Sequence, residues 1–268
     1  MNYKHFFPTF RKRYMFLLKS LKKIESMNGA SKRNLNLGAG EGDLNPLINK
    51  YCQELYACDV NKDDVKYGQK LNQSVLYSVQ DGQNLSYQDN YFDVVICMEV
   101  IEHVAQKEKV LSEIKRVLKP NGFLIITFPC NNYPFTYDPI NYILNYFNKK
   151  VFIGAHAYGH EGLIIKNDFE SLVSSNSLNI IDQQYLSHYF SGLTEMYWVG
   201  FAQRILKDNA NNIKQVETKR NNIFLRPKSF IPDKMWPSDF IIKVDDYFST
   251  KKSPKSIGLG YLLQRDHC

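Results

Sequence analysis

The chain has 268 residues, of which 44% are hydrophobic, and a formal net charge of +7. This is enough apolar material for the core of one domain with insertions. No apolar run approaches the roughly 18 residues that a membrane-spanning helix needs, so the composition excludes a membrane-embedded class.

Five cysteines occur without a C-x-x-C pair, namely Cys52, Cys58, Cys97, Cys130 and Cys268. An odd number without the spacing of a disulfide framework indicates free thiols in a reducing compartment. The N-terminal segment lacks the pattern of a signal peptide. We therefore expect a cytoplasmic protein.

Residues 1–32 are predicted to form a basic amphipathic helix. Apolar residues recur there with helical spacing, namely Tyr14, Leu17, Leu18, Leu21 and Ile24. Basic residues are expected to cover the rest of its solvated surface, namely Arg11, Lys12, Arg13, Lys19, Lys22 and Lys23. Residues 1–33 hold nine Lys or Arg against one acid, so the rest of the chain is close to neutral. Two interpretations stay open: the helix packs on the protein core, or it meets anionic lipid or phosphate.

A glycine-rich loop follows the first predicted strand. Residues 34–37 alternate polar and apolar, and Gly38, Gly40 and Gly42 then form a G-x-G-x-G pattern. Glycine has no Cβ, so a ligand can lie directly on this backbone. The spacing differs from the G-x-G-x-x-G of dinucleotide-binding loops, and a tighter loop suits a nucleoside without a phosphate. Asp43 is predicted to cap the helix that follows.

Acidic residues end the next two predicted strands. Asp59 follows residues 54–58 and lies 21 positions beyond Gly38, and Asp81 follows residues 74–80. An acid about 20 residues beyond such a loop accepts hydrogen bonds from ribose hydroxyls. The two acids therefore predict a nucleoside site at the carboxyl ends of these strands.

Strand and helix patterns alternate over residues 33–129, which predicts a parallel sheet with helices on both faces. We expect helices over residues 61–71, 104–118, 139–150 and 166–176, and strands over residues 91–97, 178–189 and 256–264. Residues 118–127 are expected to close a helix with a turn and to open the fifth strand. A last strand this far along makes residues 191–255 an insertion, with a helix over 194–206 and a lid over 224–240. Residues 130–165 form a second substrate-side insertion.

The ordered features resemble the class I S-adenosylmethionine-dependent methyltransferases, of the type found in ubiquinone biosynthesis. The resemblance rests on the glycine loop, Asp59, Asp81, the Phe-Asp-Val-Val strand and the Leu-Lys-Pro-Asn-Gly turn, over residues 33–129. It implies a Rossmann-like α/β fold in a single domain over residues 1–268. The seven-stranded sheet would be mostly parallel, with its last strand antiparallel, helices on both faces and an added lid.

The same resemblance implies that S-adenosyl-L-methionine is the methyl donor. The residues implied to bind it are Gly38, Ala39, Gly40, Gly42, Asp59, Val60, Asp81, Gly82 and Glu99. In this family the glycines line the methionine side, Asp59 would contact the ribose and Asp81 the adenine amino group. Since the loop and both acids lie outside the N-terminal arm, we expect deletion of residues 1–13 to leave cofactor affinity intact.

Methyl transfer to a hydroxyl requires a base near the acceptor. The candidates by residue type are His103, His156, His160, His188, Glu99, Glu102 and Asp138. Proximity to the strand edge favours His103 and His160, with Glu102 as their acidic neighbour. Glu99-x-x-Glu102-His103 also resembles the metal site of small-RNA 2′-O-methyltransferases, which makes Glu99, Glu102, His103 and His160 metal candidates. Relatives with the same sequence have no known metal, and we expect none here.

We expect O-methylation of a small-molecule, sugar or glycan, or lipid-linked acceptor, because aromatic insertions suit a ring-shaped acceptor. The alternatives are an RNA 2′-O-methyltransferase with metal assistance and a non-catalytic S-adenosylmethionine-binding protein. The near-neutral catalytic body argues against a stable nucleic-acid partner. The N-terminal arm is a candidate for peripheral contact with an anionic membrane.

Overall fold

The computed structural model describes residues 7–130, 139–149, 164–188, 190–191, 235–249 and 256–267. Contacts divide the chain into two compact units, which we describe separately. The sheet unit consists of Arg13–Pro129, Ile164–Gln184 and Leu259–Cys268, and the second unit of Met1–Lys12, Cys130–Leu163 and Tyr185–Gly258. The expectation of a single domain over the whole chain stays a prediction.

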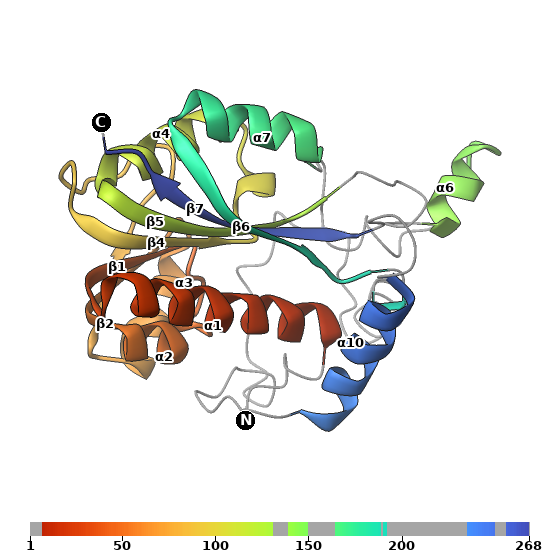
Figure 1. Ribbon diagram of the computed structural model, residues 1–268, viewed down its shortest axis with the longest axis horizontal. Coiled ribbons are helices and arrows are strands. Elements are labelled where there is room, and N and C mark those ends of the chain that lie inside the picture. The colour runs from red at the N-terminus through yellow and green to blue at the C-terminus, as the bar shows by residue number, and fades with distance from the viewer. Residues whose placement is uncertain are drawn as a thin grey trace. The chain divides into compact units, whose positions relative to one another are not determined.

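A seven-stranded sheet has the strand order β3-β2-β1-β4-β5-β7-β6 (Figure 1). Its strands are β1 (Ser31–Leu37), β2 (Cys52–Asp59), β3 (Val75–Val79), β4 (Phe92–Met98), β5 (Leu118–Pro129), β6 (Leu178–Leu186) and β7 (Gly258–Arg265). Strand β1 pairs in parallel with β2 and with β4, and the pairs β2–β3 and β4–β5 are also parallel. The predicted Rossmann-like sheet is confirmed.

Strand β7 lies between β5 and β6 and runs antiparallel to them. The Ile257 amide donates to the Ser187 carbonyl (2.9 Å), and the Asp266 amide donates to the Ser177 carbonyl (3.2 Å). Because residue numbers rise along β7 while those of its partners fall, the two strands run in opposite directions. Residues 258–263 are all buried, as expected for a strand covered on both faces. The final strand predicted over residues 256–264 is confirmed, and its bounds in the structure are Gly258–Arg265.

Helices cover both faces of the sheet. The helices of this unit are α1 (Pro8–Asn28, from Arg13 onward), α2 (Asn45–Ile48), α3 (Lys62–Leu71), α4 (Lys107–Val117) and α7 (Lys166–Ser175). Figure 1 shows α1, α2 and α3 on one face, and α4 and α7 on the other. The 3₁₀ turns η2 (Asn49–Tyr51) and η3 (Ile101–His103) precede β2 and α4. Helix α4 starts three residues later than expected, because Val104, which ends η3, has an extended backbone conformation.

The N-caps of two helices can be compared with the sequence. Helix α3 begins where the sequence predicts it, whereas the predicted cap of α2 is wrong. The Asn61 side chain caps α3 by accepting hydrogen bonds from the amides of Asp63 (3.0 Å) and Asp64 (3.4 Å). Asp43 does not cap α2, since the N-cap position is Leu44 and no side chain bonds there. The glycine loop continues as a turn through Asp43, so the four-residue helix begins after it.

The Leu-Lys-Pro-Asn-Gly segment lies inside β5 as a bulge. The pairing between β4 and β5 shifts from Phe92–Leu118 to Val94–Phe123, so the extra β5 residues loop out of register. Asn121 has a φ of 62°. A Cβ at Gly122 would lie 2.8 Å from the Lys119 carbonyl oxygen, so the tight bulge requires glycine at that position.

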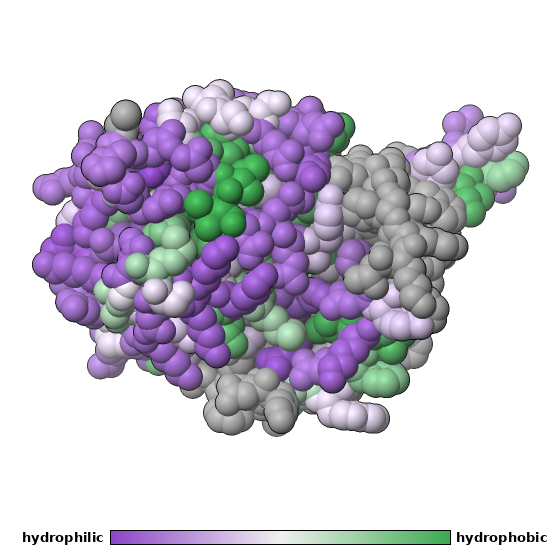
Figure 2. All heavy atoms as spheres, viewed as in Figure 1, coloured by the Kyte–Doolittle hydropathy of each residue, from purple (hydrophilic) through white to green (hydrophobic). Residues whose placement is uncertain are grey.

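Helix α1 buries the apolar face predicted for it, while Leu18 is half-buried. Its outward surface is hydrophilic (Figure 2). Two of its cations are not solvated as expected: Arg11 and Lys12 are only 2% and 6% exposed. Within the second unit, Arg11 pairs with Asp239 (2.9 Å) and Lys12 with Asp246. These carboxylates compensate the buried charges.

The second unit contains α6 (Pro139–Asn145) and α10 (Trp236–Ser249). Helix α6 is shorter than the helix predicted over residues 139–150. The sequence pattern predicts no helix over the residues of α10, and the start of α10 overlaps the lid expected over residues 224–240. Its Asp245 carboxylate accepts hydrogen bonds from the amides of His188 (2.6 Å) and Phe190 (2.9 Å). The predicted helix over residues 194–206 lies outside the described residues, as do large parts of both predicted insertions.

Four cysteines are free thiols, namely Cys52, Cys58, Cys97 and Cys130. Cys58 on β2 and Cys97 on β4 both pair with Leu37, from opposite sides of β1. Burial raises the pKa of Cys58 to about 12 and also raises that of Cys97. Among the described residues, no helix is both long and apolar enough to cross a bilayer.

Candidate active site

The glycine loop joins the carboxyl end of β1 to α2, and its glycines have different surroundings. Gly38, Gly40 and Gly42 have φ angles of 69°, 52° and 85°, a region that favours glycine. A Cβ at Gly38 would lie 2.2 Å from Val100 Cγ2, whereas a Cβ at Gly40 would meet nothing within 4 Å. Gly38 therefore permits packing of the protein on itself, while Gly40 faces open space into which a ligand can extend.

Asp59 at the end of β2 is bonded to this loop. Its Oδ2 accepts a hydrogen bond from the Gly40 amide (2.8 Å), and its Oδ1 accepts one from the Asn61 amide (2.9 Å). The Ala39 amide also donates to the Cys58 carbonyl (2.9 Å). A carboxylate has about four acceptor positions, so two remain for the vicinal hydroxyls of a ribose.

Val60 and the segment after β3 flank Asp59. The Val60 side chain is exposed, which leaves apolar surface beside the carboxylate. The Gln80 amide donates to the Asp59 carbonyl (3.1 Å), which joins the ends of β2 and β3. Asp81 accepts a hydrogen bond from the Gln83 amide (2.9 Å), which holds its carboxylate in a turn with Gly82. An exposed apolar side chain beside a fixed carboxylate suits a purine ring with an amino group.

Glu99 lies one residue beyond β4, next to the glycine loop. Its φ is 56°, an uncommon conformation for a residue other than glycine. Its Oε1 accepts a hydrogen bond from Thr127 Oγ1 (2.9 Å) on β5, and its Oε2 lies 2.8 Å from Arg13 Nη2 on α1. Neighbours on two other elements thus hold the Glu99 carboxylate at the same edge as Gly38. No sequence pattern singles out Arg13 or Thr127, and Arg13 is one cation in a basic run.

Glu102 is a buried carboxyl group beside a more exposed histidine. Its side chain is 1% exposed, and neither carboxyl oxygen has a hydrogen-bond partner among the described residues. Burial, followed by the negative charge of Glu99, raises the pKa of Glu102 to about 8. His103 Nε2 lies 3.7 Å from Glu102 Oε1, and the His103 side chain is 50% exposed. His103 is therefore the member of this pair that an approaching acceptor can reach.

Substitution of Glu102 by glutamine should remove a pH dependence of folding stability. The folded pKa of about 8 exceeds the unfolded value of about 4.5. Between these pH values the unfolded chain loses its proton more readily, so this group lowers stability as the pH rises to about 8 and adds no further change above it. Glutamine stays neutral. Between about pH 5 and pH 8, the urea midpoint of the wild type should therefore fall relative to that of Glu102→Gln.

The exposed Glu108 provides the control for that measurement. Glu108→Gln should follow the wild type at both pH values. If Glu102→Gln and Glu108→Gln show the same difference from wild type, the carboxyl of Glu102 does not hold its proton in the folded protein.

Alanine substitutions should separate the roles of two loop glycines. Gly29→Ala is the reference, since Gly29 has a φ of 75° and open space around it, and should cost about 1–2 kcal/mol of stability. Gly40→Ala should cost the same but weaken S-adenosylhomocysteine binding. Gly38→Ala should cost about 1–3 kcal/mol more, because Val100 must move. Urea unfolding and calorimetry provide the two measurements, and equal stability of Gly38→Ala and Gly29→Ala would contradict this assignment.

Several predicted site residues are not brought to this edge by the described structure. His160, His156 and Asp138 lie outside the described residues. His188 belongs to the second unit, where its Nε2 lies 3.9 Å from Asp246 Oδ1. Within the described part of the chain, no three His, Cys, Asp or Glu residues gather in a geometry that could hold a metal ion.

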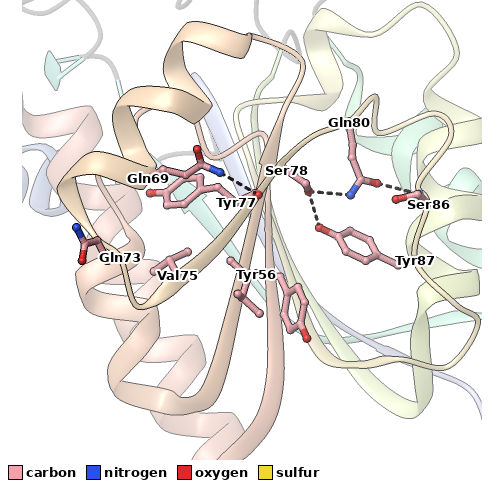
Figure 3. A pocket seen from close by; sticks show the side chains of 10 residues that line it. Tyr56, Gln69, Gln73, Val75, Tyr77, Ser78, Gln80, Ser86 and Tyr87 are labelled. Carbon is pink, nitrogen blue, oxygen red and sulfur yellow. Dashed lines mark hydrogen bonds between the residues drawn. The ribbon is translucent and has the colours of Figure 1, made fainter.

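A separate hollow follows the outer edge of the sheet. It has a volume of about 610 Å³ and is lined by residues of β3 and its neighbours, including Tyr56, Tyr77, Ser78 and Tyr87. Figure 3 shows that Ser78 bonds to both Gln80 and Tyr87 there. These side chains mostly bond to one another, and the glycine loop, Asp59 and Glu99 are absent from the lining. We therefore place the candidate site at the carboxyl ends of the strands, where ligands bind in open α/β sheets.

Residues 35–126 match a family described as a methyltransferase domain. Among curated relatives, the ubiquinone/menaquinone biosynthesis C-methyltransferase UbiE of Hydrogenovibrio crunogenus is 33% identical over 34% of this chain and 40% of its own length. The norajmaline N-methyltransferase of Rauvolfia serpentina is 33% identical over 35% of each chain. The chain thus spans less than half the length of these two relatives.

Solved structures share the fold over most of the chain. A SAM-dependent methyltransferase from Archaeoglobus fulgidus superposes with a TM-score of 0.54 at 11% identity, covering 94% of each chain. The [4+2]-cyclase SpnF superposes with a TM-score of 0.56 at 14% identity, covering 93% of this chain and 80% of its own. The second likeness shows that the fold alone does not define the reaction.

The sheet order, the glycine loop and the acids at the strand ends define a Rossmann-like nucleoside-binding fold. Together with the match of residues 35–126 to a methyltransferase domain, they support a class I S-adenosylmethionine-dependent methyltransferase. The surroundings fit that methyl donor, because Gly40 faces open space and Asp59 retains acceptor positions. The residues that would hold it are those at the ends of β1, β2, β3 and β4.

Proposed function

We propose that the protein transfers the methyl group of S-adenosylmethionine to a hydroxyl oxygen of a small-molecule, glycan or lipid-linked acceptor. The sulfonium of this donor supplies an electrophilic methyl group. The chain's residues would align donor and acceptor, exclude water and remove the proton of the hydroxyl. The observation that carries the proposal is the placement of Asp59, Glu99 and the open side of Gly40 at one edge of the sheet.

The choice of oxygen rests on His103 and Glu102. A hydroxyl must lose its proton during transfer, and the half-exposed imidazole of His103, after the end of β4, is our candidate to take it. Glu102 lies beside this imidazole, and burial raises the pKa of its carboxyl to about 8. An amine acceptor can react as the free base and needs no such group at the moment of transfer.

C-methylation is a second candidate. The curated relatives include an enzyme named as a C-methyltransferase of ubiquinone and menaquinone biosynthesis. An activated ring carbon also requires removal of a proton, so His103 would serve both reactions. Contact of the N-terminal arm with an anionic membrane stays a prediction, and such contact would suit a lipid-linked acceptor of either kind.

The test is transfer of labelled methyl from S-adenosylmethionine by the purified protein. Acceptors should include phenols, sugars, lipid-linked glycans, quinols and a small-molecule extract of the producing cells. Mass spectrometry of the labelled product would locate the methyl group on oxygen or on carbon. His103→Gln should lose turnover while keeping donor affinity, and Asp59→Ala should lose donor affinity. A wild-type protein that binds the donor tightly but labels nothing would indicate a non-catalytic binding protein.

A further inference from the structure

We propose that Arg13 on α1 binds the carboxylate of the methyl donor's methionine moiety, while Glu99 binds its ammonium group. This inference rests on the proposed function. It concerns a residue outside the glycine loop and the strand-end acids, and it assigns the N-terminal helix a direct part in ligand recognition.

Glu99 lies at the same edge of the sheet as the glycine loop. In the parallel pair β1–β4, Leu37 is opposite Cys97, so the residues after these two positions emerge at the same edge of the sheet. Val100, which follows Glu99, packs directly against Gly38. The Glu99 carboxylate therefore lies beside the start of the glycine loop, where an amino-acid group of a bound donor would reach.

The groups at this edge of the sheet are mostly acidic. Four carboxyl groups lie at this edge: Asp59, Asp81 and Glu99 supply negative charge, and Glu102, with its raised pKa, adds little at neutral pH. A methionine moiety carries a carboxylate as well as an ammonium, and a carboxylate would be repelled by acids unless a cation lay with them. Among the described residues, the cation that forms an ion pair with one of these four groups is Arg13, which pairs with Glu99.

The Arg13 guanidinium can contact Glu99 and a second carboxylate at the same time. Arg13 Nη2 lies 2.8 Å from Glu99 Oε2, and the two side chains are 25% and 23% exposed. A guanidinium has five N–H donors in a planar fork, so one contact to Glu99 leaves donors for a second carboxylate. A zwitterion can then place its ammonium on Glu99 and its carboxylate on Arg13, with each charge matched by its opposite.

The inference reverses our expectation that residues 1–13 are dispensable for cofactor binding. That expectation assumed that every contact with the ligand comes from the loop and the strand-end acids. The Arg13–Glu99 ion pair instead places the last residue of that deletion at the site.

The test compares two ligands by calorimetry: S-adenosylhomocysteine and its decarboxylated analogue, which keeps the ammonium but lacks the carboxylate. The wild type should bind the first about 10- to 100-fold more tightly, because a charge-assisted hydrogen bond is lost with the carboxylate. Arg13→Met should bind both ligands with nearly equal affinity. The cycle of two proteins and two ligands isolates the coupling of Arg13 to the carboxylate from any general effect on folding.

Lys19→Met is the matched control, because Lys19 lies on the same helix and pairs with Asp182 (2.9 Å). It should keep the wild-type preference. Arg13→Gln, which is neutral but polar, is a second variant in case Arg13→Met folds poorly. A full wild-type preference in either folded Arg13 variant would overturn the inference while leaving the proposed function standing. A wild type that binds neither ligand would overturn both.

Discussion

A chain that stops after residue 255 is expected not to fold cooperatively. The truncation removes β7 together with Ile257 and Asp266 on either side of it, which form backbone hydrogen bonds with residues flanking β5 and β6. Its side chains at Leu259, Tyr261, Leu262 and Leu263 are 0% exposed. Burial of each such side chain contributes about 1.5–3 kcal/mol, and the sum is similar to the roughly 5–15 kcal/mol that stabilises a whole domain.

A chain that stops after Asp266 is the control, since it keeps β7 and the hydrogen bond from the Asp266 amide to the Ser177 carbonyl. It should melt as the full chain does and respond to S-adenosylhomocysteine. Thermal melts of both truncated proteins, with and without this ligand, make the comparison. A cooperative, ligand-stabilised melt of the shorter chain would mean that β5 and β6 can close the sheet without β7.

Replacement of Asp59 by alanine should weaken S-adenosylhomocysteine binding by about 1.5–3 kcal/mol, or roughly 10- to 100-fold. Two effects contribute. The ribose hydroxyls lose a charged acceptor, and the Gly40 amide loses the partner that fixes the loop. Calorimetry provides the affinity, and urea unfolding shows how much of the loss reflects the folded state itself.

Asp63→Asn is the matched control for Asp59→Ala. Asp63 is an exposed acid in the first turn of α3, only four residues away, and its charge lies outside the loop contacts. Its substitution should leave the affinity within about twofold, since long-range effects of exposed charges are screened. An unchanged affinity of Asp59→Ala would show that the ribose is not held at the end of β2.

The cofactor half of the sheet could be predicted from sequence because its signals are local. The loop glycines, Asp59 and Asp81 each follow a short apolar strand, and the parallel register then brings the strand ends together. The position of β7 was also predictable, since no other stretch near it has the uninterrupted apolar pattern of a strand buried on both faces.

Helix α10 lacks an apolar periodicity in the sequence because its buried face is partly polar. Ser238, Ile242 and Asp245 are buried with helical spacing, and two of these three residues would be assigned to solvent in a search for apolar periodicity. Arg11 was assigned to the solvated surface for a related reason. Its partner Asp239 is 228 positions away in the sequence, and a local sequence pattern cannot predict an ion pair over that separation.

The Glu99–Arg13 contact could not be predicted for two reasons. Glu99 adopts a positive φ that its residue type does not suggest, and this conformation directs the chain after β4. Arg13 is chemically equivalent to the cations around it until the helix is docked. The family pattern identifies residues on the sheet, but which residue of a covering helix reaches them depends on tertiary packing.

The two thiols beside Leu37 make local opening of the central strands measurable. Cys58 and Cys97 flank the last residue before the glycine loop, and their raised pKa values leave very little thiolate in the closed fold. An alkylating reagent can attack them only in molecules whose central strands have separated. The rate of modification therefore reports the free energy of local opening directly beneath the cofactor loop, without any introduced probe.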